Sequence, residues 1–261
     1  IIADNTYLYL GTDNGILVYN YRTDKYEQPE TDFPTDVRTM ALQGDTLWIG
    51  SLNGLYTYQL NTKKLASLDS KSNGLPHHTI YSIIRTTDNQ IYIGTYNGLC
   101  RYIEESGKFE NIPLPVNRNV SNLFVNSLLE DTSRQCIWIG MEGSLFQYTP
   151  ATGLMKPIDA FHNNSIKSLA LDGDGNLLAG TDNGLYVYQN DNGTLQHIVH
   201  DSRNIQSLTN NIIWNIFADQ EQNIWLGTDY GISLSRYNSA LQFIPISQIT
   251  GTGDGNQFYS L

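Results

Sequence analysis

The sequence predicts an all-β fold, a β-propeller of four-stranded antiparallel blades with six blade repeats. An apolar strand ending in glycine, a short polar turn and a second glycine recur six times along the chain. The marker glycines lie 39, 44, 46, 40 and 47 residues apart, at Gly11, Gly50, Gly94, Gly140, Gly180 and Gly227. Repetition at this period indicates a propeller or a solenoid. The composition agrees, because 17 Tyr and 22 Gly against 3 Met suit pleated strands joined by tight turns.

The third copy shows the expected plan of one blade. Asn97-Gly98 is the signal for a tight hairpin between its second and third strands. Pro113 is expected in the fourth strand, at an outer edge that tolerates a missing N–H. The four strands are predicted at 80–85, 91–95, 99–103 and 109–114, and the next blade opens with a strand at 123–128. Four antiparallel strands in roughly 40–45 residues describe a propeller blade.

We expect a single β-propeller region over residues 1–261. Its blades are predicted at about 1–33, 34–69, 76–115, 120–159, 163–200 and 208–246, with 251–261 as the start of a further blade strand. Both ends match parts of an innermost strand, so we expect the chain to be a piece of a longer protein. The repeats leave open whether six blades close as a ring or form an arc of a larger propeller.

Other structural and functional classes fit less well. No segment keeps the apolar spacing of a helix over three turns, and a parallel β-helix needs a much shorter repeat. The net charge of -11 argues against nucleic acid as a partner and against a polybasic membrane contact. No run of about 18 apolar residues is present, so we expect no direct membrane contact by this segment.

The usual motifs of catalysis are missing, and we predict no catalytic residue, no metal and no cofactor. His77 and His78 are expected to point in opposite directions on extended backbone, in a solvated loop. Residues 172–176 look like the start of a calcium loop, but Gly at the sixth and Glu at the twelfth position are lacking. A hairpin turn is therefore favoured there. Cys100 and Cys136 are expected to be unpaired strand residues that act as small hydrophobes.

The repeated phrase is interpreted as scaffold. An aromatic residue such as Trp48 is expected to pack between adjacent blades, and a marker glycine such as Gly50 to admit close backbone approach. Recognition is expected at one face, where the turn between strands two and three and the loop into the next blade open together. Their polar groups suit a hydroxyl-rich ligand such as a sugar, although Asn and Asp are also common turn residues. The candidate ligand-binding residues are Arg38, Asn53, Tyr96, Asn97, Arg118, Asp182, Asn183, Asp229 and Tyr230.

The phrase Ile-Trp-Ile-Gly-Thr-x-x-Gly-Leu-x-x-Tyr resembles the two-component-regulator propeller repeat, most clearly at 48–51, 91–102, 137–148 and 224–231. The resemblance implies a periplasmic sensor propeller in a membrane-anchored, homodimeric hybrid two-component protein with a cytoplasmic histidine kinase. Family propellers are typically seven-bladed, whereas six repeats occur here. Members of the family detect oligosaccharides released from polysaccharides and switch on genes for their use.

We therefore expect a chain that is not itself an enzyme, and that recognises an oligosaccharide ligand and controls polysaccharide-utilisation genes. The first alternative is a propeller that serves as a protein-interaction or dimerisation scaffold. The second is a polysaccharide lyase or hydrolase, which would need convergent acids or a Tyr or His base with a shifted pKa.

Overall fold

The structure is a computed structural model of the 261-residue chain. It describes residues 1–27, 32–68, 73–115, 123–161, 164–189, 193–237 and 242–245. The regular elements described in these ranges are strands, apart from one short 3-10 turn, η1, at Asp159–Phe161. The chain divides into two compact units, unit 1 (Ile1–Thr132) and unit 2 (Ser133–Leu261).

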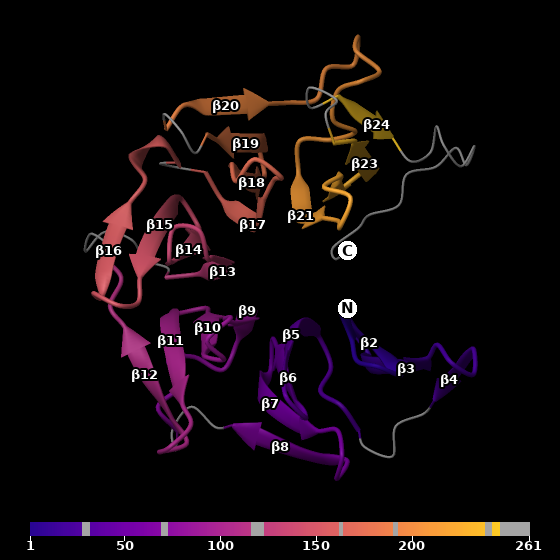
Figure 1. The fold of residues 1–261 in the computed structure, drawn as a ribbon, viewed down its shortest axis with the longest axis vertical. Coiled ribbons are helices and arrows are strands. Elements are labelled where there is room, and N and C mark those ends of the chain that lie inside the picture. Colours follow the sequence, from indigo (N-terminus) through magenta and orange to yellow (C-terminus); the bar gives the residue numbers. More distant parts are fainter. Residues whose placement is uncertain are drawn as a thin grey trace. The chain divides into compact units, whose positions relative to one another are not determined.

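The described strands form six four-stranded sheets, which are the blades 1 to 6 in chain order (Figure 1). In each sheet, four strands that follow one another in the chain are also neighbours in the sheet. The predicted all-β propeller architecture of four-stranded blades is thus confirmed. The assignment of all 261 residues to a single propeller region stays a prediction, and residues 251–261 lie outside the described part of the chain.

Unit 1 contains blades 1 to 3 and the strand β13 (Val125–Asp131). Blade 1 consists of β1 (Ile2–Ala3), β2 (Tyr7–Thr12), β3 (Gly15–Asn20) and β4 (Lys25–Glu27). Blade 2 consists of β5 (Val37–Gln43), β6 (Thr46–Ser51), β7 (Gly54–Gln59) and β8 (Lys64–Leu68). Blade 3 consists of β9 (Ile80–Arg85), β10 (Ile91–Thr95), β11 (Gly98–Ile103) and β12 (Lys108–Ile112).

Unit 2 contains three strands of blade 4 and all of blades 5 and 6. The three strands are β14 (Cys136–Met141), β15 (Ser144–Thr149) and β16 (Leu154–Pro157). Blade 5 consists of β17 (Ile166–Leu171), β18 (Leu177–Thr181), β19 (Gly184–Tyr188) and β20 (Leu195–Ile198). Blade 6 consists of β21 (Ile213–Ala218), β22 (Ile224–Thr228), β23 (Gly231–Ser235) and β24 (Phe243–Pro245).

Two strand boundaries in unit 1 differ from those predicted. Strand β12 ends at Ile112, which is the last residue paired with β11, so Pro113 lies beyond the strand. Proline has no N–H to offer to the ladder, which is a sufficient reason for the pairing to stop before it. The first strand of blade 4 begins at Val125, and Leu123 makes only an isolated parallel bridge with Asn97.

The marker glycines lie against the residue that opens the first strand of the following blade. A Cβ added at any of five of them would come within 2.6 or 2.7 Å of a γ-carbon of that residue. The pairs are Gly11 with Val37, Gly50 with Ile80, Gly94 with Val125, Gly140 with Ile166 and Gly180 with Ile213. No side chain fits at such a distance, so only glycine lets successive blades approach this closely. The predicted role of these glycines as scaffold is confirmed.

The aromatic residue of the repeated phrase packs into the core between successive blades. Trp48 is buried in one cluster with residues of blade 3, including Ile80 and Ile91, and its ring centroid lies 4.8 Å from that of Tyr102. In unit 2, the ring centroid of Trp138 lies 6.3 Å from that of Tyr188, one blade further on. The hydrophobic core described in each unit therefore lies between neighbouring sheets.

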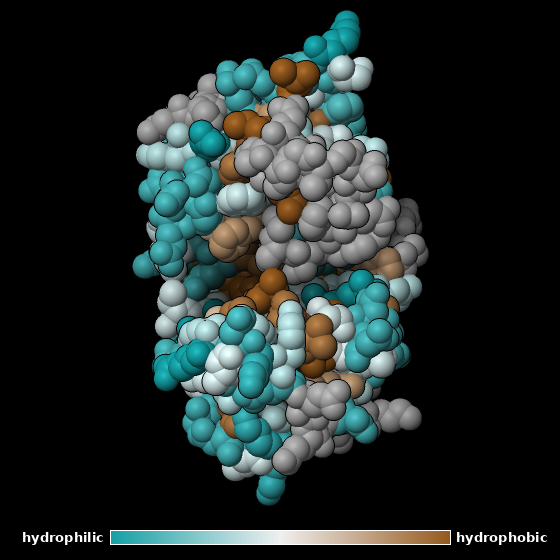
Figure 2. All heavy atoms as spheres, turned by 90° about the vertical axis from the view of Figure 1, so that its right-hand side faces the viewer, coloured by the Kyte–Doolittle hydropathy of each residue, from teal (hydrophilic) through white to brown (hydrophobic). Residues whose placement is uncertain are grey.

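Hydrophilic residues cover most of the described surface in the view of Figure 2, with apolar residues in smaller areas. This surface accords with the net charge of -11. No helix among the described residues is long and apolar enough to cross a membrane.

Candidate functional site

The turn between the second and third strands is built in the same way in five of the six blades. A Ser or Thr at the end of the second strand donates its hydroxyl hydrogen to the carbonyl of the second glycine, and accepts a hydrogen bond from the backbone N–H two residues on. In blade 3, Thr95 Oγ1 donates to the Gly98 carbonyl at 2.9 Å and accepts from the Asn97 N–H at 3.1 Å. The same pair of bonds is made by Thr12, Ser51, Thr181 and Thr228.

These hydroxyl bonds fix the backbone of four predicted site residues, since the N–H groups of Asn53, Asn97, Asn183 and Tyr230 are held by them. The sequence reasoning assigned no role to the Ser or Thr. The recurring spacing of that hydroxyl residue three positions before a glycine was the available signal. Blade 4 has Met141 in this position and lacks the hydroxyl.

The turns and the loops that lead into first strands lie together, as the sequence predicted, and form what we call the turn face. In unit 1, the Asp36 N–H donates to the Asp13 carbonyl at 3.0 Å, and the Thr79 hydroxyl donates to the Leu52 carbonyl at 3.0 Å. In unit 2, the same kind of bond joins Gly143 to Asn164 at 3.1 Å, and Gly184 to Asn211 at 2.7 Å. Within each unit, turns and entry loops are therefore held together by hydrogen bonds to backbone carbonyls.

Four blades carry a one-residue bulge at the start of the first strand. In blade 2 the register shifts between Val37 and Thr39, and Arg38 between them has no partner in the ladder. The corresponding residues of blades 3, 5 and 6 are Tyr81, Lys167 and Trp214. A bulge bends its strand and re-aims the extra side chain, and bulges are over-represented beside active sites. Sequence reasoning selected Arg38 as a loop residue and missed its three counterparts.

Aromatic side chains gather on the turn face of unit 1, and we call His77, His78, Tyr81, Tyr96 and Phe124 the aromatic cluster. The Tyr96 ring is central, with its centroid 4.9 Å from that of His77 and 4.1 Å from that of Phe124. Phe124 in turn lies 5.8 Å from Tyr81, and His77 stacks on His78 at 4.4 Å. Tyr96 is 38% exposed, so its ring is both supported by neighbours and open to solvent.

The stacking of His77 on His78 corrects the prediction that adjacent histidines point in opposite directions. The chain bends at His78 and is not extended there, so both rings project to one side, with an interplanar angle of 24°. The Thr79 N–H donates to His77 Nδ1 at 3.0 Å. Burial lowers the pKa of His77, and the charge of His78 lowers it further. Within the described ranges, no group of three or more His, Cys, Asp or Glu side chains could hold a metal ion.

Arg38 lies beside this cluster. The Ile83 N–H of β9 donates to Thr39 Oγ1 of β5 at 3.1 Å, so the two first strands are neighbours, and Arg38 and Tyr81 each follow the first residue of their strand. Burial raises the pKa of Tyr81, the neighbouring Tyr96 raises it further, and the positive charge of Arg38 lowers it. Arg38 is exposed, and among the described residues none shares a hydrogen bond or an ion pair with it. Its guanidinium is therefore available to a ligand.

The other predicted site residues in the first half of the chain are Asn53, Asn97 and Arg118. Asn53 and Asn97 are exposed, and the Asn53 amide reaches the Asp36 carboxylate in a long bond of 3.4 Å. The structure thus brings Arg38 and Tyr96 into one site and places Asn53 and Asn97 on neighbouring turns of the same face. Arg118 lies outside the described residues.

In unit 2, the predicted site residues of blade 5 and those of blade 6 belong to two separate networks of side-chain contacts. In blade 6, the Trp214 indole N–H donates to the Asp229 carboxylate at 2.6 Å, while the Lys167 ammonium lies 4.5 Å from the centroid of the Trp214 ring. Tyr230 beside them is 62% exposed. In blade 5, the Asn183 carbonyl is 2.6 Å from a ring nitrogen of His197, which stacks on Tyr186, and Asp182 and Asn183 are exposed.

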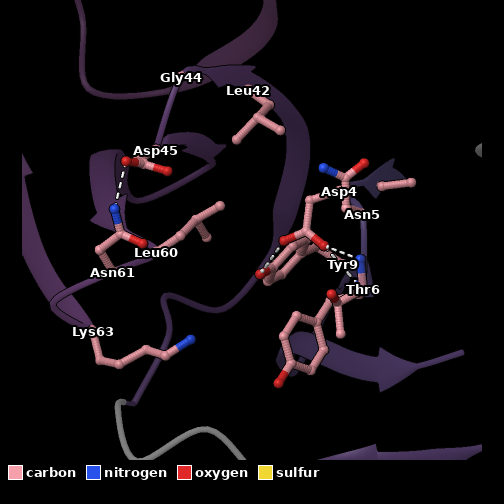
Figure 3. A pocket seen from close by; sticks show the side chains of 12 residues that line it. Asp4, Asn5, Thr6, Tyr9, Leu42, Gly44, Asp45, Leu60, Asn61 and Lys63 are labelled. Carbon is pink, nitrogen blue, oxygen red and sulfur yellow. Dashed lines mark hydrogen bonds between the residues drawn. The ribbon is translucent and has the colours of Figure 1, made fainter. Parts of the chain in front are cut away.

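A cavity of about 660 Å³ lies elsewhere in unit 1, between the hairpin turns of blades 1 and 2 (Figure 3). Figure 3 shows the Asp4 carboxylate on one side and the pair of Asp45 and Asn61 on the other. Asp4 accepts hydrogen bonds from two backbone N–H groups and from the Tyr9 hydroxyl. The Asp4 and Asp45 carboxylates that line the cavity are therefore already hydrogen-bonded within the protein, and none of the predicted site residues lines it. The turn face, not this cavity, is the better candidate site.

Two further sequence interpretations are confirmed. Residues 172–176 form a turn, because Asp172 Oδ1 accepts hydrogen bonds from the N–H groups of Asp174 and Asn176. Both cysteines are buried and free. Burial raises the pKa of the Cys100 thiol well above its usual range, so this residue behaves as part of the core.

A family model described as "Two component regulator propeller" matches residues 74–97 and 207–230. The first segment contains the bulge residue Tyr81 together with His77 and Tyr96, and the second contains Trp214 and Asp229. The match therefore falls on the first strand, its bulge and the following turn, which are the parts that build the turn face.

Two relatives extend the comparison. The extracellular domain of BT4673 from B. thetaiotaomicron, described in one crystal structure as a proposed hybrid two-component system and in another as a proposed one-component system, is 82% identical. That match covers 100% of this chain and 35% of the solved domain, with a TM-score of 0.88. Histidine kinase P4 of Formosa agariphila is 28% identical over 292 residues, which cover 98% of this chain and 20% of the kinase.

The chain thus spans about a third of that extracellular domain and a fifth of that kinase. The computationally designed Ika8 protein shares the fold alone, at 14% identity and a TM-score of 0.63 over 93% of this chain and 71% of that protein.

Proposed function

We propose that this chain, which carries two-component regulator propeller repeats, is a ligand-sensing part of a hybrid two-component signalling protein and recognises an oligosaccharide. The observation that carries the proposal is the aromatic cluster on the turn face of unit 1, with the exposed Tyr96 ring and the unpaired Arg38 beside it.

The physical basis is the match between this surface and the chemistry of sugars. The apolar face of a sugar ring stacks on an exposed aromatic ring, while its hydroxyl groups need donors and acceptors held in place. Tyr96 is an exposed ring of the cluster, and Asn53 and Asn97 are exposed amides on turns fixed by hydroxyl bonds. A preformed surface of this kind loses little conformational entropy when it binds a ligand.

The proposal includes the setting of the whole protein. The 82% identical relative is an extracellular domain, so we place this chain outside the cytoplasmic membrane, in the periplasm, as part of a membrane-anchored protein. Ligand binding would be passed to a kinase portion, as the similarity to Histidine kinase P4 suggests, and would control genes for polysaccharide use.

The test is a thermal shift and calorimetry screen of the full extracellular region against a panel of oligosaccharides. At least one oligosaccharide should raise Tm, and Tyr96→Ala should abolish that rise. Tyr26→Ala is the matched control, because Tyr26 is also an exposed tyrosine (70%) but lies on the outer strand β4. Stabilisation by another ligand class, with no response to any oligosaccharide, would overturn the proposal.

A second candidate function is a scaffold for a protein partner or for a second copy of the chain. The observation that favours it is the exposure of apolar side chains on outer strands, with Leu154 62% exposed on β16. Outer strands are edges, and exposed edges recruit other chains. Sizing of the full extracellular region, with and without sugar, separates the two functions. A homodimer that forms without sugar and dissociates on Leu154→Asp would support the scaffold.

A further inference from the structure

The bulges set one residue of each first strand apart from its neighbours. The residue before the bulge is β-branched and packs on the marker glycine of the preceding blade, at Val37, Ile80, Ile166 and Ile213. The residue after it is small and polar, at Thr39, Ser82, Ser168 and Asn215. The bulge residue itself differs among these four blades, as Arg38, Tyr81, Lys167 and Trp214. The residues on either side of the bulge are therefore similar in these four blades. The bulge residue, which has no partner in the ladder, is different in each.

A position that lies outside the ladder can change without loss of strand pairing. All four bulge residues are large, and all four end in a group that donates hydrogen bonds. The four side chains differ from one another in charge and in shape, so each can contact a different chemical group of a ligand. Variation at positions outside the ladder leaves strand pairing intact, as a role in recognition requires.

The charge around the bulge residues differs between the two units. In unit 2, the Lys167 cation lies over Trp214, whose indole N–H is bonded to the Asp229 carboxylate, so an acid is part of that network. In unit 1, the charge of Arg38 acts on Tyr81, and among the described residues no carboxylate is hydrogen-bonded to a ring of the aromatic cluster. The positive charge of Arg38 at this site therefore contrasts with the net charge of -11 of the whole chain.

The acid nearest in sequence to Arg38 is already engaged. The Asp36 carboxylate accepts a hydrogen bond from the Thr35 hydroxyl at 3.2 Å and the long bond from the Asn53 amide, and it forms no ion pair with Arg38. An unpaired guanidinium presents a planar fork of donors that matches a carboxylate or a sulfate group.

From this arrangement we infer that the turn face of unit 1 selects an anionic sugar residue, with its carboxylate or sulfate on Arg38 and its ring on Tyr96. The inference rests on the proposed function and adds the chemical class of the ligand. Arg38 and Tyr81 are then specificity-determining residues of the site, and the stacked pair of His77 and His78 supports the ring of Tyr96.

The experiment compares matched pairs of oligosaccharides by calorimetry on the full extracellular region. One pair is an oligogalacturonide and its carboxyl-reduced, neutral counterpart; the other is a sulfated oligosaccharide and its desulfated form. The charged member of one pair should bind at least tenfold more tightly, and the pair that responds identifies carboxylate or sulfate as the recognised group. Added salt should reduce this preference.

Variants then assign the preference to Arg38. Arg38→Gln should weaken binding of the charged member about 10- to 100-fold and leave the neutral member within about twofold, because a charge-assisted bidentate pair is lost. Arg38→Lys should keep part of the affinity, since the charge remains without the fork. Arg85→Gln is the matched control for net charge, because Arg85 is exposed at the opposite end of its strand, β9.

The outcomes separate this inference from the proposed function. Equal binding of charged and neutral members, unaffected by Arg38→Gln, would overturn the inference and leave oligosaccharide sensing intact. An equal loss in Arg38→Gln and Arg85→Gln would overturn it too, by assigning the effect to net charge. Failure of every oligosaccharide to bind would overturn both. Unfolding curves of the variants, required to match the wild type, exclude a loss of fold as the cause.

Discussion

Replacement of Gly50 by alanine is the sharpest test of how the blades are held together. A Cβ at Gly50 would lie 2.6 Å from Ile80 Cγ2 in the next blade and 2.6 Å from Thr39 Cγ2 in its own. Both contacts are far inside van der Waals distance, and Ile80 is fully buried, so neither strand can yield without a shift of its neighbour. Overpacking of this kind costs about 1–3 kcal/mol, and we expect Gly50→Ala at the upper end of that range.

The assay is urea unfolding of the extracellular region followed by tryptophan fluorescence. Gly44→Ala is the matched control, since Gly44 has φ of 57° and nothing within 4 Å of an added Cβ. There the cost is backbone strain alone, about 1 kcal/mol. Gly50→Ala should therefore lower the free energy of unfolding by clearly more than Gly44→Ala does.

A double mutant shows whether the cost arises from the contact with the next blade. Ile80→Ala should destabilise by about 2–5 kcal/mol, because it empties a buried site. Combined with Gly50→Ala it should cost at least about 1 kcal/mol less than the sum of the two, since the new methyl group enters space that Ile80 has vacated. Additive costs, or a Gly50→Ala variant as stable as wild type, would refute the packing role of the marker glycine.

Three further predictions follow from the turn face and the core. Thr95→Val should lower the free energy of unfolding by about 1–3 kcal/mol in urea titration, because two hydrogen bonds of a buried hydroxyl are lost; the exposed Thr87→Val should cost less. His77 has a lowered pKa in the folded state, so the unfolded chain binds its proton more readily and stability should fall as pH drops below about 6.5; His77→Gln should reduce that fall between pH 7.5 and 5.5, and an unchanged pH profile would contradict the assignment. Cys100 and Cys136 should resist a thiol reagent in the native protein and react in denaturant, whereas rapid native labelling would mean that the strands open.

The features that recur in the repeats could be predicted from the sequence. A glycine recurs at the position of Gly50 in every copy, and an aromatic residue at the position of Trp48 in all copies but the fifth, so their role follows from the pattern and from the geometry of paired strands. Strand ends were harder, because the pairing stops at Ile112, one residue before Pro113 with its missing N–H, whereas the apolar pattern continues to Leu114. The stacking of His77 and His78 depends on a bend in a loop whose conformation the local sequence does not specify.

The bulges were missed because each follows the first residue of its strand, so the alternation of apolar and polar positions is shifted at that one residue only. At Val37-Arg38-Thr39 the sequence is compatible both with a regular strand and with a bulged one. The choice is made by packing, since Val37 must reach Gly11 of the preceding blade while Thr39 pairs with Gly50 in its own. Comparison of the copies at this position, rather than at the glycines, was the signal that could have revealed the site.

The same geometry separates stability from recognition within each blade. A change at Gly50 disturbs two blades, because the glycine lies against Ile80 of the next one. A change at Arg38 disturbs neither a ladder pair nor an ion pair among the described residues, so its structural cost should be small. Exchange of bulge residues between blades should therefore alter the preferred ligand while the fold persists. A propeller built in this way can adopt a new ligand by substitution at a few positions, with its inter-blade contacts unchanged.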